Sequence, residues 1–349
     1  MTTELVIALD AMGGDDAPRI VVEGARLAQT RFPGARFLLF GDEARLKPML
    51  RDDEPLARVS EIRHTAEAVG AADAPAQALR RGRGSSMGLA VKSVRDGEAQ
   101  VVVSAGNTGA LMAMAKFMFK TMSGISRPAL ASVLPTLQGE TVMLDLGANV
   151  ECDQENLIQF AVMGAAFARV LLRVERPRVG LLNVGAEELK GNESVKRASL
   201  VLRDTPLPLE FAGFVEGDGI GKGAADVIVT DGFTGNVALK TAEGIAQLAF
   251  GLLKKAFEHS PLTKVGYVLA KPGLKAMRQH LDPSNHNGAV LIGLNGLVVK
   301  SHGSATASGF ATAIGVAANM VRDQLCDKIA EDLKRVYPHD AGANRAAMS

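Results

Sequence analysis

Two basic side chains stand in polar, glycine-rich stretches where they could take part in chemistry. Lys190 directly precedes Gly191 and a predicted helix that Asn192 could cap, so its ammonium could reach an anion bound at that helix end. His302 opens a later helix, whose dipole disfavours the charged imidazole and suits a neutral hydrogen-bond partner or base. As alternatives, a single lysine is usually solvated surface, and such a histidine could simply cap the helix or face solvent.

A loop with paired glycines follows the first apolar run of the chain. Gly13 and Gly14 come shortly after Asp10 and would expose backbone N–H groups at the start of the next helix, where an anion is attracted. An ordinary turn with Asp16 as the helix cap explains the loop equally well. The three carboxylates of Asp10, Asp15 and Asp16 argue against a bare anion cradle unless they orient basic partners or an activated hydroxyl.

Two further loops place amides and hydroxyls after apolar runs. One contains Asn107, Thr108 and Gly109, and the other ends at Asn149. Small residues let a ligand approach the backbone, while the amides and the hydroxyl offer hydrogen bonds. The plainer interpretation of Asn107 is an ordinary helix cap.

Another candidate loop runs from Asp231 through Phe233 to Asn236. Asn236 could cap a helix or contact a ligand. Phe233 could line an apolar channel, and a place in the core is an equal alternative.

These loops follow short apolar runs that alternate with helical patterns. The predicted strands cover 5–9, 37–40, 101–103, 142–146, 179–182 and 227–229, and the predicted helices cover 18–31, 42–50, 86–95, 108–120, 154–172, 193–202 and 233–258. Continuous apolarity is typical of strands buried on both faces of a largely parallel sheet. The fold class is therefore α/β with helices on both faces, and ligands should bind beyond the carboxyl ends of the strands.

No repeat or low-complexity linker divides the chain. We therefore expect a single catalytic unit over residues 1–337, with a helical hairpin near 233–280. A division of this unit into two subdomains is the alternative. The last residues, 338–349, are predicted to be a frayed tail.

Composition excludes several classes of protein. The 349 residues carry 39 basic and 38 acidic side chains, with no Trp and two Tyr, which disfavours a nucleic-acid partner. Cys152 and Cys326 form neither a disulfide framework nor a zinc motif and indicate a reducing compartment. No run suits a signal peptide or a membrane span, so a cytoplasmic location is expected.

Known nucleotide motifs are lacking. The stretch from Gly219 to Ala224 matches the dinucleotide fingerprint only loosely, because a strand rather than a helix follows it, and no segment satisfies the P-loop pattern. There is also no nucleophile elbow and no HExxH motif.

Several motifs stand in a definite order along the chain. They are Leu9 to Asp15, Ser104 to Gly109, Lys190 to Glu193, Asp231 to Asn236, and Asn295 to Gly303. In these motifs the chain resembles the bacterial PlsX family of phosphate acyltransferases, which move a fatty acyl group from acyl carrier protein to inorganic phosphate. The resemblance implies a three-layer α/β/α fold similar to phosphate acetyltransferases and to isocitrate or isopropylmalate dehydrogenases. It also implies a homodimer, and a long-chain acyl phosphate consumed by a membrane glycerol-3-phosphate acyltransferase in phospholipid synthesis.

Phosphorolysis of a thioester requires no covalent enzyme intermediate, because phosphate at neutral pH is already a nucleophile. We expect Lys190 to stabilise phosphate or the oxyanion, while Asp10 or Asp231 orients Lys190 or His302. The remaining substrate site is predicted to comprise Gly13, Gly14, Asn107, Thr108, Gly109, Asn149, Asn192, Phe233 and Asn236.

A cysteine nucleophile and a bound metal are the alternative chemistries. Cys152 is the rival nucleophile, but no basic neighbour in the sequence would lower its pKa. Asp10, Asp15 and Asp16 could hold magnesium, although adjacent carboxylates at a helix start usually act as caps, so neither metal nor cofactor is expected. The alternative functions are a nicotinamide-dependent dehydrogenase of the related fold class and a non-catalytic acyl or carrier-protein binding module.

Arg80, Arg81 and Arg83 form the densest basic cluster. Acyl carrier proteins are acidic, so this cluster is the predicted carrier-binding surface. A loop that faces phosphate or is merely solvated is the alternative.

Beyond Pro261, apolar residues fall on one helical face among lysines. Leu262, Val265 and Leu269 form this stripe, which suits a helix lying on an anionic membrane surface. Peripheral membrane association is also what the family resemblance implies. Periodicity alone favours the alternative, a hairpin packed in a dimer interface.

Overall fold

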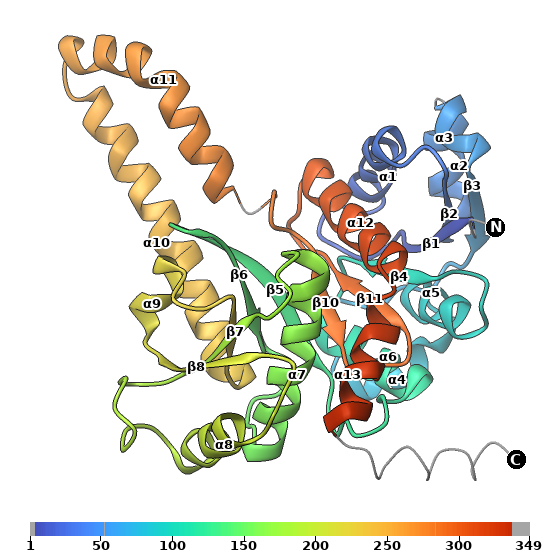
Figure 1. The fold of residues 1–349 in the computed structure, drawn as a ribbon. Coiled ribbons are helices and arrows are strands. Elements are labelled where there is room, and N and C mark those ends of the chain that lie inside the picture. The colour runs from blue at the N-terminus through green and yellow to red at the C-terminus, as the bar shows by residue number, and fades with distance from the viewer. Residues whose placement is uncertain (1–3, 52, 283, 337–349) are drawn as a thin grey trace, which may run out of the picture.

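The protein is built around one continuous sheet of eleven strands, ordered β3-β2-β1-β4-β11-β10-β5-β6-β9-β7-β8 (Figure 1). The computed structural model describes residues 4–51, 53–282 and 284–336, so the predicted tail lies outside the described residues. The strands are β1 (Leu5–Asp10), β2 (Ala35–Gly41), β3 (Ser60–His64), β4 (Val101–Ser104), β5 (Ala129–Thr136), β6 (Gly139–Leu144), β7 (Arg178–Leu182), β8 (Glu210–Val215), β9 (Val227–Val229), β10 (Ala289–Ile292) and β11 (Leu297–Lys300).

Helices cover both faces of this sheet. They are α1 (Arg19–Arg31), α2 (Glu43–Arg51), α3 (Glu54–Arg58), α4 (Pro75–Arg81), the 3-10 turn η1 (Gly82–Gly84), α5 (Ser86–Arg95), α6 (Thr108–Phe119), α7 (Gln154–Leu171), α8 (Glu193–Asp204), α9 (Gly217–Lys222), α10 (Gly232–Glu258), α11 (Pro261–Leu281), α12 (Ala307–Arg322) and α13 (Leu325–Val336).

Successive side chains of a strand point to opposite faces of the sheet, so the core consists of two layers. In β1, Ile7 and Leu9 point into the layer with α1, α7 and α12, whereas Ala8 points into the layer with α4, α5 and α6. All three side chains are fully buried, which explains why the strand reads as a continuous apolar run. The predicted three-layer α/β/α class is confirmed.

The sheet changes direction at its centre. Strands β1, β2, β3, β4 and β11 run parallel, and so do β6, β7, β8 and β9, but β10 and β5 join these halves through antiparallel pairs. The two parallel groups therefore run in opposite directions. As a result, the carboxyl ends of the two groups point in opposite directions along the sheet.

Helices α10 and α11 form an antiparallel hairpin that projects from the body (Figure 1). Asp231 caps α10 by accepting from the backbone N–H of Thr234, and Ser260 caps α11 through a reciprocal capping box with Thr263. Pro261 occupies the first turn of α11, where its missing N–H costs nothing. The caps fix the chain reversal between the two helices.

Candidate active site

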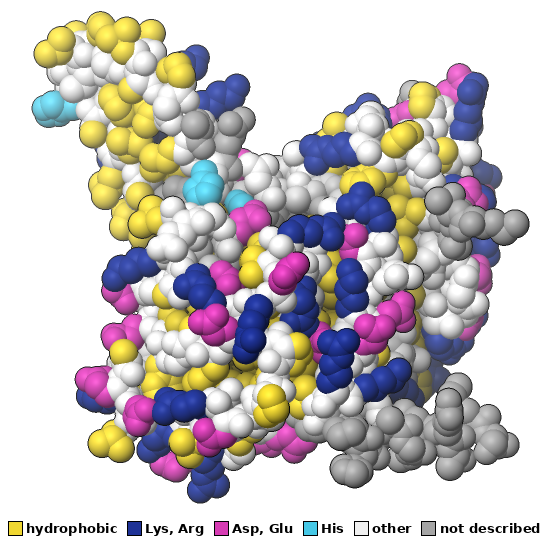
Figure 2. All heavy atoms as spheres, in the orientation of Figure 1, with side chains coloured by type: hydrophobic (Ala, Val, Ile, Leu, Met, Phe, Trp, Pro, Cys, Tyr) yellow, Lys and Arg dark blue, Asp and Glu magenta, His cyan; other side chains and the backbone are white. Residues whose placement is uncertain are grey.

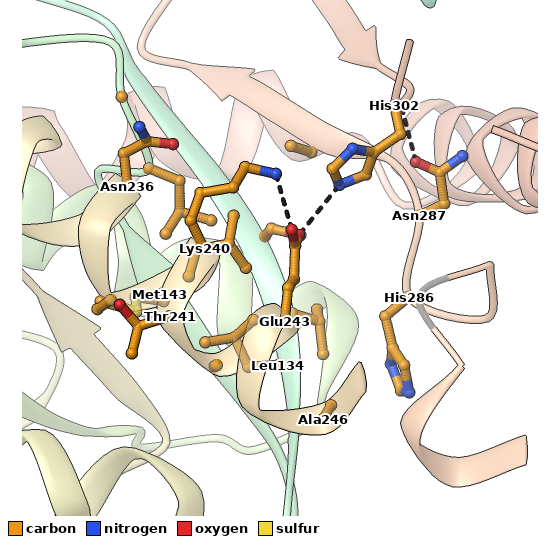
Figure 3. Close-up of a pocket in the computed structure, with 18 of the residues that line it drawn as sticks. Leu134, Met143, Asn236, Lys240, Thr241, Glu243, Ala246, His286, Asn287 and His302 are labelled. Carbon is orange, nitrogen blue, oxygen red and sulfur yellow. Dashed lines mark hydrogen bonds and ion pairs between the residues drawn. The ribbon is translucent and has the colours of Figure 1, made fainter. Parts of the chain in front are cut away.

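A cavity of about 900 Å³ opens between α10 and the centre of the sheet (Figure 3). Its floor includes Leu134 of β5 and Met143 of β6, and α10 forms one wall. The opposite side is built by the segment before β10 and by the loop that follows β11. Two parts of the chain that are distant in sequence therefore meet across this cavity.

Three charged or polar side chains form a connected cluster at the cavity wall. The Lys240 ammonium lies 2.8 Å from a carboxylate oxygen of Glu243, and the other oxygen lies 3.4 Å from Nε2 of His302 (Figure 3). The backbone N–H of His302 donates to Oδ1 of Asn287 at 3.0 Å. Helix α10 and the loop after β11 are thereby joined, with a cation and an imidazole facing the same space.

Lys300 adds a second cation to this cavity. Its Nζ donates to the carbonyl of Ala105 at 3.3 Å and also to that of Ser301. Burial lowers the pKa of Lys300 to about 8, although Asp10 and Asp15 oppose that shift. The ammonium is therefore mostly protonated at neutral pH and only partly hydrated, a state suited to binding an anion.

Burial also lowers the pKa of His302, and nearby Lys240 and Lys300 act in the same direction. Glu243 opposes the shift by favouring the imidazolium. The result is a histidine that is mainly neutral at pH 7. The predicted cause, a helix dipole, is wrong, because α12 begins only at Ala307 with Thr306 as its cap.

Asp10 lies beneath the site as a buried anchor. Its carboxylate accepts from the hydroxyls of Ser86 and Ser104, each at 2.6 Å, while burial raises its pKa. The charge of Asp10 also raises the pKa of Lys300, against the effect of burial. Asp10 was predicted to orient Lys190 or His302. Its hydrogen bonds instead connect β1 to β4 and α5.

The paired glycines allow close packing beside this anchor. A Cβ on Gly13 would lie 2.4 Å from Oδ2 of Asp10, and Gly14 has a φ of +111°, a conformation that side chains disfavour. The N–H of Asp15 donates to the Gly303 carbonyl at 2.9 Å. The loops after β1 and β11 therefore meet.

The loop after β4 contributes less to the cavity than the sequence suggested. Thr108 lines it, but Asn107 is the cap of α6, and its amide donates to the carbonyls of Ala71 and Asp73. A Cβ on Gly109 would lie 2.8 Å from the ring of Pro75. Asn107 and Gly109 thus serve packing against the 70–75 segment.

Asn149 is likewise engaged inside the protein. Its amide donates to Pro128 and to Asp145, each at 2.8 Å, so both N–H groups are already paired. The buried Asp145 carboxylate also accepts from the backbone N–H groups of Leu130 and Ala148. These bonds fix the turn after β6.

The predicted loop from Asp231 to Asn236 forms the cap and first turn of α10, and its Asn236 lines the cavity. Asp231 binds the N–H and hydroxyl of Thr234, each at 2.8 Å, and Phe233 is 63% exposed. The structure therefore places Asn236 beside Lys240 and gives Asp231 a capping role.

Lys190 and Asn192 lie in the segment between β7 and α8. Lys190 is exposed and does not occur among the described residues that line the cavity. Asn192 caps α8 by accepting from the N–H of Val195 at 2.9 Å. In the sheet, β7 lies farther from β11 than β9 does, and the structure does not bring Lys190 to His302.

The two thiols have environments unlike that of a nucleophilic cysteine. Burial raises the pKa of Cys152 to about 12, with Asp145 and Asp231 adding to the shift, and burial raises that of Cys326 to about 12. A thiolate at neutral pH is therefore disfavoured at both positions. Over residues 4–51, 53–282 and 284–336, no three His, Cys, Asp or Glu side chains gather as a metal site would require.

The predicted carrier-binding arginines lie at the end of α4 and in the turn η1 that follows it. Arg80, Arg81 and Arg83 are exposed. The Arg83 guanidinium lies 5.0 Å from the centre of the Phe117 ring, and Lys120 lies at the same distance from that ring. Their side chains thus form a basic surface on α4 and α6.

Comparisons with known proteins show to which family the chain belongs. The model of the fatty acid synthesis protein family matches residues 5–328. The phosphate acyltransferase of Rhodospirillum rubrum is 53% identical over 336 residues, covering 96% of each chain, and that of Parvibaculum lavamentivorans is 55% identical over 337 residues, covering 96% of this chain and 93% of its own. The chain belongs to the PlsX family of phosphate acyltransferases.

Solved structures of other proteins share the fold of this family member. The EutD phosphotransacetylase from Staphylococcus aureus has a TM-score of 0.58 at 15% identity, covering 93% of this chain and 94% of its own. A phosphotransacetylase from Streptococcus pyogenes has the same TM-score at 16% identity, covering 94% and 95%. The predicted likeness to phosphate acetyltransferases is therefore confirmed for the fold.

Proposed function

We propose that this enzyme transfers a long-chain fatty acyl group from acyl carrier protein to inorganic phosphate, giving acyl phosphate for phospholipid synthesis. One observation carries the proposal. Two lysines and a neutral histidine face a cavity whose other walls are largely apolar. An anion and a fatty acyl group would need these two environments side by side.

Phosphate would bind between Lys240 and Lys300, which supply positive charge from opposite walls. Asn236 and Thr108 add neutral hydrogen-bonding groups. A phosphate oxygen then attacks the thioester carbonyl, the C–S bond breaks, and the carrier thiolate takes up a proton. Lysine charge stabilises the oxyanion of the tetrahedral intermediate.

Neutral His302 can donate a hydrogen bond to phosphate or accept its proton as the nucleophile attacks. Glu243 positions the imidazole and Lys240 at the same time. Because attack comes from phosphate itself, no cysteine nucleophile is needed, in agreement with the raised thiol pKa values.

The donor requires its own recognition surface. Arg80, Arg81 and Arg83 are positively charged and exposed, and acyl carrier proteins are acidic. We assign the carrier to this surface, which adjoins α6, the helix whose first residue, Thr108, lines the cavity.

The projecting hairpin offers a site for membrane association and for pairing of two subunits. Leu262, Val265 and Leu269 are 80%, 58% and 78% exposed, and Figure 2 shows apolar side chains gathered over this projection. Large exposed apolar patches mark interaction surfaces. Over the described residues, no helix is long and apolar enough to cross a bilayer. We assign the tip to an anionic lipid surface and the stem to a homodimer contact, which would deliver acyl phosphate in the cytoplasm near a membrane glycerol-3-phosphate acyltransferase.

The proposed function is tested by supplying phosphate with either palmitoyl acyl carrier protein or palmitoyl coenzyme A. We expect acyl phosphate and free thiol in equal amounts, with the carrier-bound donor preferred. A donor preference for coenzyme A would overturn the carrier assignment. A reaction that requires a nicotinamide instead of phosphate would favour the dehydrogenase alternative.

A further inference from the structure

The face of α10 that lines the cavity is polar and charged near the start of the helix and apolar farther along it. Asn236, Lys240 and Glu243 come first, and Ala246 and Phe250 follow on the same face at helical spacing. From Lys240, a rise of 1.5 Å per residue places Ala246 about 9 Å and Phe250 about 15 Å along the helix axis. The charged cluster is therefore continued by an apolar path.

The wall opposite this path is also apolar. It includes Leu134 and Pro135 of β5 and Ile220 of α9. The N–H of Leu137 donates to the Gly221 carbonyl at 3.0 Å, which holds α9 against the end of β5. This end of the cavity therefore has a defined second side.

Burial shows which part of the apolar lining is available to a ligand. Leu130, Met143 and Leu146 are 7%, 0% and 4% exposed, since they already pack in the core. Leu134, Ala246 and Phe250 are only partly buried. A Cβ on Gly221 would meet no atom within 4 Å, so the wall formed by α9 leaves open space.

We propose that the acyl chain leaves the charged cluster and runs along α10 toward Phe250, and that Ala246 sets how long a chain the enzyme accepts. The inference rests on the proposed acyl transfer and adds its chain-length determinant. A butyryl chain ends before Ala246, whereas a palmitoyl chain passes it. A methyl side chain at this position (Figure 3) leaves the path open.

The first test replaces Ala246 by phenylalanine and compares palmitoyl with butyryl acyl carrier protein as donors. Ala246→Phe should lower kcat/KM for palmitoyl by about tenfold or more, since loss of a few methylene contacts has such effects, while the value for butyryl stays unchanged. The matched control is Ala249→Phe, on an exposed position of the same helix outside the cavity lining. It should leave both values unchanged.

Phe250→Ala provides a second variant that removes bulk and does not depend on the fold tolerating a larger residue. It should raise the ratio of stearoyl to palmitoyl turnover. Circular dichroism and mass by light scattering accompany each variant.

The possible failures are distinguishable. If the wild-type enzyme forms no acyl phosphate from any donor, the proposed function fails. If it forms acyl phosphate but Ala246→Phe affects palmitoyl and butyryl equally, the chain-length inference is overturned and the function stands. If Ala246→Phe changes the mass of the oligomer and leaves the preference for acyl chain length unchanged, this part of the cavity holds a second copy of the chain. That result also overturns the inference.

Discussion

Nε2 of His302 lies 3.4 Å from a carboxylate oxygen of Glu243, joining the loop after β11 to helix α10 (Figure 3). The same carboxylate holds Lys240 at 2.8 Å. Glu243 therefore determines both where the imidazole lies and how readily it is protonated.

Replacing Glu243 by glutamine should lower the pKa of His302 further. The carboxylate favours the imidazolium, whereas burial, Lys240 and Lys300 oppose it, so a neutral amide leaves only the opposing effects. NMR titration of the His302 ring checks this shift. Glu140→Gln is the control, because Glu140 lies 3.6 Å from a different histidine, His286. An unchanged or raised pKa in Glu243→Gln would show that the contact does not act on His302.

The pKa of Lys300 predicts a pH dependence of phosphate binding. This pKa is lowered to about 8, so the ammonium is charged below that pH and loses its charge above it. KM for phosphate should therefore rise as pH increases through about 8. In Lys300→Met, KM should be high at pH 7 and insensitive to pH in this range. A wild-type KM that stays constant up to pH 9 would exclude the ammonium from phosphate binding.

Lys190 and Lys300 are rival assignments for the catalytic cation. The participation of Lys190 stays a prediction, and the cavity favours Lys300, which lines it. We expect Lys300→Ala to raise the barrier by about 2.7–4 kcal/mol, as loss of one preorganised donor does. Lys190→Ala should have a much smaller effect on kcat. An equally large loss in Lys190→Ala would instead mean that the loop after β7 closes over the bound substrates.

Many strands and helices could be predicted from the sequence because the pattern of apolar residues that marks them lies within a short segment. Continuous apolarity in β1, β4 and β9 reflects burial on both faces. The antiparallel β5 and β10 are not among the predicted strands, and β5 ends in polar and half-buried positions that break the apolar pattern. Without these two strands, the sequence does not show that the sheet changes direction at its centre.

The site was predictable only in part. His302, Asn236 and Thr108 stand in recognisable motifs that follow strands, and all three line the cavity. Glu243 lies within a long helix and carries no motif, so its contact with His302 depends on tertiary packing. Lys300 lies within the motif from Asn295 to Gly303, but only its burial distinguishes it from a surface lysine.

Charge reversal on the basic surface should weaken use of the carrier-bound donor. Arg81→Glu with Arg83→Glu should raise KM for palmitoyl acyl carrier protein and reduce its dependence on salt, because favourable charge pairing is screened by ions. KM for phosphate should not change. Reversal of Arg203 and Arg197, exposed on α8, provides the control. A salt profile identical to that of the wild type would remove the carrier from this surface.

Substitutions at the tip of the hairpin should abolish lipid binding while sparing catalysis. Leu262→Glu with Val265→Glu places two charges on strongly exposed apolar positions, so sedimentation with anionic vesicles should be lost. Acyl transfer in solution and dimer mass should remain. Leu137→Glu with Leu200→Glu, also exposed but outside the hairpin, should still bind vesicles. Retained vesicle binding in the hairpin variant would assign this segment a purely structural role.

Direct attack by phosphate is tested most sharply with palmitoyl acyl carrier protein and phosphate labelled with ¹⁸O at every oxygen. Mass spectrometry should find palmitoyl phosphate that retains all the label, with one free carrier thiol for each molecule formed and no thiol released before phosphate is added. Thiol release that precedes phosphate, or palmitate without acyl phosphate, would contradict phosphorolysis at this site.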